Sequence, residues 1–356
     1  MTRLGAGTVL VDGNLVVGDV DIADGQVIAI TGPSRGSDRV VAPGFVDLQI
    51  NGFVGVDFSA CSPGDLGRAA EALWQRGTTA FHPTLVTGPV DRTCAALATV
   101  DEAQRLGRPP GRALVMGAHL EGPFLSAARL GAHDGAHRVE PDVDLLATLL
   151  AAGPVGRMTL APELDHSLDL VESLLLRSVA VAAGHSNATA EEAHRGFDAG
   201  IRSVTHLGNA MAPFHQRAPG LFGASLVRDD VTPTLIADGA HVADDVVRLV
   251  FAATGGRVAL VSDAVSPAHA GAVPVRARAA RNDDGDLIGG LLTIAEMVRH
   301  VVELGINPST ALAAGSSHPR RLASLPHASG LQLGAEADLV VLDGDLGLIE
   351  VIDPYA

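Results

Sequence analysis

The feature that most constrains the fold of this chain is an alternation of short apolar runs with helical stretches, which begins at Val41 and continues to Leu304. Eight of these runs have the length and composition of buried strands. Parallel strands that are covered on both faces have this continuous apolar character, and helices connect them. The alternation therefore predicts an α/β fold, a (β/α)8 barrel of the TIM type, with its active site at the carboxyl ends of the strands.

The expected elements can be placed by residue number. The strands are 45–50, 78–81, 113–120, 156–161, 178–183, 201–205, 232–236 and 258–262. The helices are 63–76, 90–106, 143–152, 167–177, 189–199, 243–254 and 292–304. The sixth connection, 207–230, is longer and rich in Pro and Gly, which favours a binding loop, and residues 270–290 read as an excursion with a turn at 282–285.

Polar residues follow four of the apolar runs. Each of these polar residues stands where a strand is expected to end: Glu121 with His119, then His185, His206 and Asp263. The carboxyl ends of barrel strands meet at one mouth, so these side chains should lie close together. Glutamate and histidine can hold a divalent ion, and an aspartate can take a proton from water. The pattern indicates a metal-dependent hydrolase.

The chain is longer than a single barrel requires. A TIM barrel takes about 250 residues, whereas this chain has 356. Residues 1–40 contain β-prone runs at 8–11, 15–22 and 26–30, residues 334–344 have the same character, and 348–352 is the candidate for a final strand. We predict a small β-sandwich from residues 1–42 together with 325–356, with the barrel, residues 43–324, between its two halves.

Composition restricts the partners. The formal net charge is −16, which argues against nucleic acid or an anionic membrane surface as a partner. The N-terminus lacks the apolar core of a signal peptide, and no run approaches the ~18 apolar residues of a membrane span. Cys61 and Cys94 are the only cysteines and form no C-x-x-C, so we expect reduced thiols and a cytoplasmic enzyme for small molecules.

Lysine is absent, because all 25 basic residues are arginines. This excludes Schiff-base chemistry, a P-loop lysine and a carbamylated lysine between two metal ions. Another acid must then take the place of that bridging lysine in a metallohydrolase, and Glu121 is the candidate.

Seven motifs, taken in order, identify a family. They are Pro43-Gly-Phe-Val-Asp-Leu-Gln-Ile-Asn-Gly52, His119-Leu-Glu-Gly-Pro-Phe124, Gly131-Ala-His133, Gly184-His-Ser-Asn-Ala-Thr189, Thr205-His-Leu-Gly-Asn-Ala-Met211, Ile236-Ala-Asp-Gly-Ala-His241 and Ser262-Asp-Ala264. Over nearly its whole length the chain resembles the amidohydrolase superfamily and, within it, the N-acetylglucosamine-6-phosphate deacetylase family. The resemblance implies a TIM-type barrel with a small β-sandwich, and the hydrolysis of N-acetylglucosamine 6-phosphate to glucosamine 6-phosphate and acetate.

The resemblance also implies a metal site. Glu121, His185 and His206 match the family's metal ligands. The expected cofactor is one divalent ion per subunit, zinc first, with iron, cobalt or manganese as alternatives. Gln49 and Asn51 stand where many amidohydrolases have a His-x-His pair for a second ion, so a mononuclear site is implied.

Two residues match the family's catalytic groups. Asp263 matches the aspartate that takes a proton from water and delivers it to the leaving amine. His133 matches the residue that polarises the acetyl carbonyl and contacts the substrate, with nearby His137 as the alternative. His119 shares a strand face with Glu121 and is interpreted as a packing or supporting residue rather than a ligand.

Substrate binding is expected from the sixth connection and the seventh strand. Asn209, the backbone N–H of Ala210, and Arg217 match the family's phosphate contacts, and His241 matches a contact to a sugar hydroxyl. The sequence leaves open whether Arg217 serves its own site or that of a neighbouring subunit in the expected homodimer. Residues 288–293 depart from the family's pattern near the acyl or sugar pocket.

The sequence is compatible with two alternative functions. The first is deacetylation of N-acetylgalactosamine 6-phosphate or another N-acyl sugar. The second, from another class, is a non-catalytic sensor of a sugar phosphate on the same fold. Acetate release separates the sensor from the enzymes, and epimer preference separates the two deacetylases.

Overall fold

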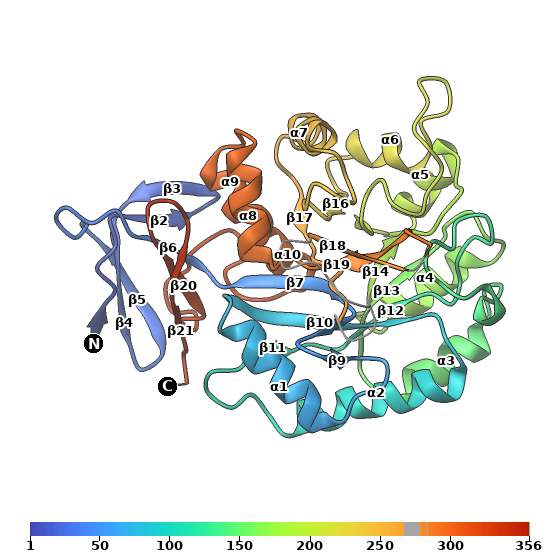
Figure 1. The fold of residues 1–356 in the computed structure, drawn as a ribbon, viewed down its shortest axis with the longest axis horizontal. Helices are drawn as coiled ribbons and strands as arrows, with labels where there is room; N and C mark the ends of the chain where they lie inside the picture. The colour runs from blue at the N-terminus through green and yellow to red at the C-terminus, as the bar shows by residue number, and fades with distance from the viewer. Residues whose placement is uncertain (267–277, 283, 356) are drawn as a thin grey trace.

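The larger part of the molecule is a parallel barrel surrounded by helices (Figure 1). The structure is a computed structural model and describes residues 1–266, 278–282 and 284–355. The barrel strands, each paired with the next in chain order, are β7 (Phe45–Ile50), β10 (Thr78–Val86), β12 (Ala118–Glu121), β13 (Val155–Leu160), β14 (Ala180–Ala183), β15 (Ser203–Val204), β16 (Thr232–Leu235) and β17 (Ala259–Leu260). The predicted TIM-type fold is confirmed.

The barrel closes just beyond the end of its last strand. Ile50 forms a parallel bridge with Ala264, and the N–H of Asp263 donates to the carbonyl of Gln49 at 2.9 Å. The first and last strands therefore meet at the level of the predicted catalytic aspartate.

Helices cover the outside of the barrel. They are α1 (Pro63–Trp74), α2 (Val90–Arg105), α3 (Val143–Ala152), α4 (Ser167–Leu175), α5 (Ala190–Asp198), α6 (Gly220–Leu226), α7 (Asp244–Ala253), α8 (Ile294–Glu303), α9 (Pro308–Gly315) and α10 (Ser317–Leu322). Capping boxes, in which Ser62, Thr189 and Thr293 pair with an acidic residue three positions on, start α1, α5 and α8. These caps explain why the predicted starts lie within two residues of the observed ones.

Two predicted elements of the barrel region differ from the structure. The predicted strand 113–120 divides into β11 (Leu114–Val115) and β12, both paired with β10. Gly117 lies in the interruption, where a Cβ would come 2.6 Å from the backbone nitrogen of Gly156, so the backbones approach closely there. The connection 207–230, predicted to be a loop, contains α6, in which six residues are buried.

Both ends of the chain build a second unit of two sheets (Figure 1). One sheet contains β1 (Thr2–Arg3), β4 (Asp19–Ala23) and β5 (Gln26–Thr31); the other contains β21 (Leu348–Ile352), β20 (Leu339–Leu342), β6 (Val40–Pro43), β2 (Thr8–Val11) and β3 (Asn14–Val17). Apolar side chains of both sheets form a separate core, which includes Val9, Val20, Val27 and Leu339. The limits 1–42 with 325–356 and 43–324 stay a prediction.

The single strand predicted for residues 15–22 is wrong. The chain leaves one sheet at Val17 and enters the other at Asp19. The N–H of Gly18 donates to the carbonyl of Gly7 at 3.1 Å, and the buried Asp19 carboxylate accepts the N–H groups of Ala6 and Val20, both at 2.8 Å. These hydrogen bonds fix the segment in which the chain passes from one sheet to the other.

A buried ionic cluster joins the sandwich to the barrel. Asp338, just before β20, accepts from Arg108 at 2.9 Å and from Arg320 of α10. Arg320 also donates to the carbonyl of Gly44 at 3.0 Å and to Thr79 Oγ1 at 2.9 Å. Burial acts to raise the pKa of Asp338, but the two guanidinium groups hold it below its ordinary value.

A β-hairpin lies between the last barrel strand and α8. It consists of β18 (Ala279–Arg281) and β19 (Leu287–Gly290). The N–H of Gly285 donates to the carbonyl of Asn282 at 3.0 Å, in the predicted turn. Part of the predicted excursion, residues 270–277, lies outside the described residues. Within the described part of the chain, no helix combines the length and the hydropathy that a membrane span requires.

Candidate metal centre and active site

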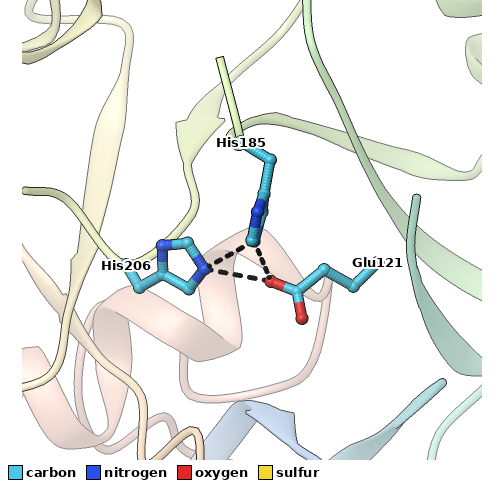
Figure 2. A group of neighbouring side chains, drawn as sticks. All are labelled: Glu121, His185 and His206. Carbon is cyan, nitrogen blue, oxygen red and sulfur yellow. Dashed lines mark hydrogen bonds and ion pairs between the residues drawn. The ribbon is translucent and has the colours of Figure 1, made fainter. Parts of the chain in front are cut away.

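The three predicted metal ligands meet at the mouth of the barrel (Figure 2). Glu121 is the last residue of β12, and His185 and His206 each follow a barrel strand by two residues. Glu121 Oε1 lies 3.1 Å from His185 Nε2 and 3.0 Å from His206 Nε2, and the two imidazole nitrogens are 3.0 Å apart. All three residues are buried, so the barrel brings them together as predicted.

These donor atoms fit a divalent cation. His185 Nδ1 lies 3.1 Å from the carbonyl oxygen of Arg129, so Nδ1 carries the proton and Nε2 directs its lone pair at the other two atoms. Two imidazole nitrogens and a carboxylate oxygen this close repel one another unless a positive charge lies between them. Nitrogen and oxygen ligands bind zinc at about 2.0–2.2 Å, which places neighbouring ligand atoms roughly 3.3 Å apart in a tetrahedron.

The electrostatics of the cluster favour positive charge. Burial acts to raise the pKa of Glu121, but hydrogen bonding to His133, His185 and His206 holds it well below its ordinary value. Burial acts to lower the pKa of His206, but the carboxylates of Glu121 and Asp263 raise it. Hence the site keeps its glutamate ionised and attracts a cation to the point where the three donors meet.

Asp263 is held beside this cluster by two amides. Asn51 Nδ2 donates to Asp263 Oδ1 at 2.7 Å, and Gln49 Nε2 donates to the same oxygen at 3.2 Å and to Glu121 Oε1 at 2.7 Å. Burial, and after it the charge of Glu121, raise the pKa of Asp263 to about 6. Its Oδ1 is thus occupied by amide donors, which leaves Oδ2 as the oxygen that can accept a proton.

His133 occupies the other side of Glu121. The backbone N–H of Thr87 donates to His133 Nδ1 at 3.2 Å, so the proton of the neutral ring lies on Nε2. His133 Nε2 is 3.5 Å from Glu121 Oε2. The alternative residue, His137, lies in a short 3-10 helix with its side chain 36% exposed. The geometry therefore favours His133 as the hydrogen-bond donor of the site.

His119 does not join the ligands. Its Nε2 lies 2.8 Å from Thr159 Oγ1 and its Nδ1 lies 3.3 Å from Thr84 Oγ1, so both ring nitrogens are engaged by threonines of neighbouring strands. The interpretation as a packing or supporting residue agrees with this position.

The cluster opens into a cavity of about 480 Å³, a volume typical of small-molecule sites. Its lining includes Glu121, His133, His185, His206, Asp263, Asn209, Ala210 and His241, together with Asn51, Asp57, Ser59, Val265, Leu287, Ile288 and Gly289. The first eight of these are residues that the sequence predicted for the site, and they surround one cavity. Arg217 is exposed on the 207–230 connection and is not among the described residues that line the cavity.

Three supporting contacts were not anticipated from the sequence. Thr87 donates its hydroxyl to the carbonyl of Glu121 at 3.0 Å while its N–H sets the His133 ring. The carbonyl of Arg129 fixes His185. Asp238 Oδ2 lies 2.7 Å from His241 Nδ1. Backbone groups leave no signal in a sequence, but the Asp-Gly-Ala-His order at 238–241 is the pattern of an Asx turn and could have indicated the third contact.

Comparison with known proteins agrees with this geometry. The model of the amidohydrolase family matches residues 40–355. The N-acetylglucosamine-6-phosphate deacetylase of Bos taurus is 38% identical over 334 residues, which cover 86% of this chain and 80% of that protein. The N-acetylgalactosamine-6-phosphate deacetylase of Escherichia coli O157:H7 is 32% identical over 347 residues, covering 93% and 92%.

A solved structure superimposes over the full length. The crystal structure of N-acetyl-D-glucosamine-6-phosphate deacetylase from Mycobacterium smegmatis matches with a TM-score of 0.90 and 32% sequence identity, covering 100% of this chain and 99% of that one. The agreement spans the barrel and the sandwich alike. The chain therefore belongs to the amidohydrolase family.

Proposed function

We propose that this enzyme hydrolyses the N-acetyl group of N-acetylglucosamine 6-phosphate to give glucosamine 6-phosphate and acetate. The observation that carries the proposal is the convergence of Glu121, His185 and His206 beside Asp263 in one cavity. Relatives with the same reaction in their names cover most of the chain, and a solved structure of similar fold has N-acetyl-D-glucosamine-6-phosphate bound.

Glu121, His185 and His206 would hold the metal, for which zinc is our first expectation and iron, cobalt or manganese the alternatives. When bound, a divalent ion supplies Lewis acidity, which lowers the pKa of water to about 7 and polarises a carbonyl. Because the amides of Gln49 and Asn51 donate to Glu121 and Asp263, they are poor partners for a second cation, which supports one ion per subunit.

The residues of this chain divide the chemistry between them. Asp263 Oδ2 takes a proton from water as the water oxygen attacks the acetyl carbon. The Nε2–H of His133 donates to the carbonyl oxygen as negative charge develops there. Asp263 then returns its proton to the nitrogen as the C–N bond breaks, which gives the amine and acetic acid. The second proton of the water then passes from acetic acid to the amine, so the final products are acetate and the protonated amine.

The phosphate and the sugar are bound away from the reacting bond. Asn209 and the backbone N–H of Ala210 line the cavity and would contact the phosphate, while His241 would contact a sugar hydroxyl. Arg217 faces solvent in its own chain, and we place it at the phosphate of the neighbouring subunit in a cytoplasmic homodimer. Binding energy from these remote groups positions the amide for attack.

Acetate release from N-acetylglucosamine 6-phosphate tests the proposal, measured beside the galactosamine epimer and the unphosphorylated sugar on one purified batch with known metal content. Fast release from the first substrate, with about one metal ion per chain, supports the proposed substrate and the mononuclear site. Binding without acetate release would contradict it and favour a sugar-phosphate sensor.

A second candidate is the deacetylation of N-acetylgalactosamine 6-phosphate, since a relative of that name is 32% identical over most of both chains. The two substrates differ in the orientation of one hydroxyl group. A kcat/KM that is higher for the galactosamine epimer would replace the proposed substrate by this one.

A further inference from the structure

A buried carboxylate lies directly behind the cavity residue His241. Asp238 follows β16 by three residues and is fully buried, whereas His241 lines the cavity. Asp238 is neither a metal ligand nor a member of the cavity lining. Burying a carboxylate costs free energy unless both oxygens accept hydrogen bonds, so the donors around Asp238 indicate what it does.

The two oxygens of Asp238 have separate partners. Oδ1 accepts the backbone N–H groups of Ala240 at 2.8 Å and His241 at 2.9 Å, which closes the turn after β16. Oδ2 lies 2.7 Å from His241 Nδ1, and the two side chains are 1% and 6% exposed. One oxygen therefore shapes the backbone, while the other is committed to the imidazole ring.

This second contact fixes which ring nitrogen carries a proton. A carboxylate oxygen can only accept, so His241 Nδ1 must donate to it. In the neutral ring Nε2 is then left with a lone pair, which accepts a hydrogen bond from a hydroxyl group. Rotation of the ring is restricted as well, because a flipped imidazole would leave Asp238 Oδ2 buried without a partner.

We propose that Asp238 is a positioning residue for substrate recognition: by holding Nδ1–H of His241, it presents Nε2 to the cavity as an acceptor for a hydroxyl of the sugar. The inference rests on the proposed function for the identity of that sugar. It goes further by assigning recognition to an Asp–His pair, of which only the histidine touches the substrate.

The charged surroundings of the pair are also defined. Arg278 Nη1 donates to the carbonyl of Asp238 at 3.3 Å and lies 3.2 Å from His300 Nδ1, and His300 Nε2 lies 2.9 Å from Asp244 Oδ1. Asp244 and His300 thus form a second Asp–His pair close by, which does not line the cavity. It provides a matched control.

The discriminating variant is Asp238→Asn. Its amide oxygen can still accept both backbone N–H groups, but its Nδ2 would donate toward His241 Nδ1 and force the ring proton onto Nε2. The acceptor presented to the substrate would then become a donor. We expect kcat/KM to fall about tenfold to a hundredfold, mainly through KM, as is typical when a buried polar group loses its partner.

A double-mutant cycle with His241→Ala separates positioning from a purely structural role. If Asp238 acts through the imidazole, Asp238→Asn has almost no further effect on kcat/KM in the His241→Ala background. An equal loss in both backgrounds would overturn the inference, because the turn alone would then explain it. Asp238→Ser, which also retains an acceptor for the turn, completes the same cycle should Asp238→Asn fold poorly. The control Asp244→Asn should leave kcat/KM within about twofold.

Nitrogen NMR of histidine-labelled protein provides a readout that needs no turnover. The resonance that disappears in His241→Ala identifies the ring, which should be protonated at Nδ1 in the parent and at Nε2 in Asp238→Asn. An unchanged tautomer would contradict the inference even in an active enzyme. Absence of acetate release by the parent protein would instead contradict the proposed function, so the two failures are distinguishable.

Discussion

The mouth of the barrel and the β-sandwich differ in backbone strain and in the polarity of their side chains. Around the cavity, His185, His206, Ala210 and Asp263 all have positive φ, at +48°, +30°, +46° and +46°. Such conformations cost about 1–3 kcal/mol each for residues other than glycine. The polar side chains of His185 and His206 are buried and the carboxylate of Asp263 is half-buried. His206 Nδ1 has no hydrogen-bond partner among the described residues. These features lower the free energy of unfolding, so the mouth is less stable than an apolar core of the same size would be.

The β-sandwich, in contrast, has a core of buried apolar side chains. Its core consists of small and branched apolar side chains, including Val9, Val41, Leu339 and Val341, each at most 1% exposed. Strands from the two ends of the chain pair along β6 and β20, from Val40 with Leu342 to Pro43 with Leu339. The comparison indicates that stability and chemistry are located in different regions, and each prediction below tests that separation.

The largest expected effect is on the chemistry of the mouth. Replacing Asp263 by asparagine removes the group proposed to accept the proton of water, so kcat should fall about 10²- to 10⁴-fold. The melting temperature should be unchanged or higher, because a half-buried carboxylate near Glu121 is replaced by a neutral amide. Steady-state kinetics, elemental analysis and calorimetry on the same sample check this, with the exposed Asp245→Asn as control. An active Asp263→Asn enzyme would remove Asp263 from the mechanism.

The next effect should fall on stability alone. Asp338→Ala leaves Arg108 and Arg320 buried without their carboxylate, which typically costs about 3–5 kcal/mol of unfolding free energy. Denaturant unfolding should show the loss, whereas kcat per folded, metal-loaded molecule should match the parent. A large change in kcat at equal metal content would show that the sandwich and the mouth are coupled after all.

His133→Ala should have an intermediate effect at the mouth. Loss of one donor to a developing oxyanion costs about 3 kcal/mol, or roughly a hundredfold in kcat, with little change in KM. The half-buried His137, replaced by alanine, is the control for a histidine on the same segment. Equal losses from both variants would mean that the segment 131–138, rather than the His133 ring, is what matters.

The smallest effect is a pH dependence that separates the two regions. The pKa of Asp263 is raised to about 6, so its basic form is lost as the pH falls through 6 and kcat should drop about tenfold per pH unit below that. The pKa of Asp338 is instead lowered in the folded protein, so its contribution to stability is present above its ordinary value of 3.8 and is lost only as the pH falls below it.

Activity should therefore fall to about a tenth of its plateau near pH 5 while the protein remains folded. Activity and circular dichroism measured on one pH series check this. Loss of both signals at the same pH would show that unfolding, and not the protonation of Asp263, limits activity in acid.

Sequence reasoning placed the barrel strands and the ligands because both depend on local order. Apolar runs of strand length alternate with helices, and polar residues end the strands, so topology alone brings Glu121, His185, His206 and Asp263 to one mouth. The capped helix starts were predictable for the same reason. Where a strand was divided, at Gly18 and Gly117, the break depends on a backbone approach that the pattern of side chains does not record.

The sequence by itself determined the fold class, the residues of the metal cluster and the family to which the chain belongs. Tertiary structure alone decided which ring nitrogen of His133, His185 and His241 carries the proton. It also decided that Asn51 and Gln49 occupy one oxygen of Asp263. Hydrogen bonds between segments far apart in the chain depend on ångström-scale positions. Those positions follow from packing the whole barrel, and no short motif encodes them.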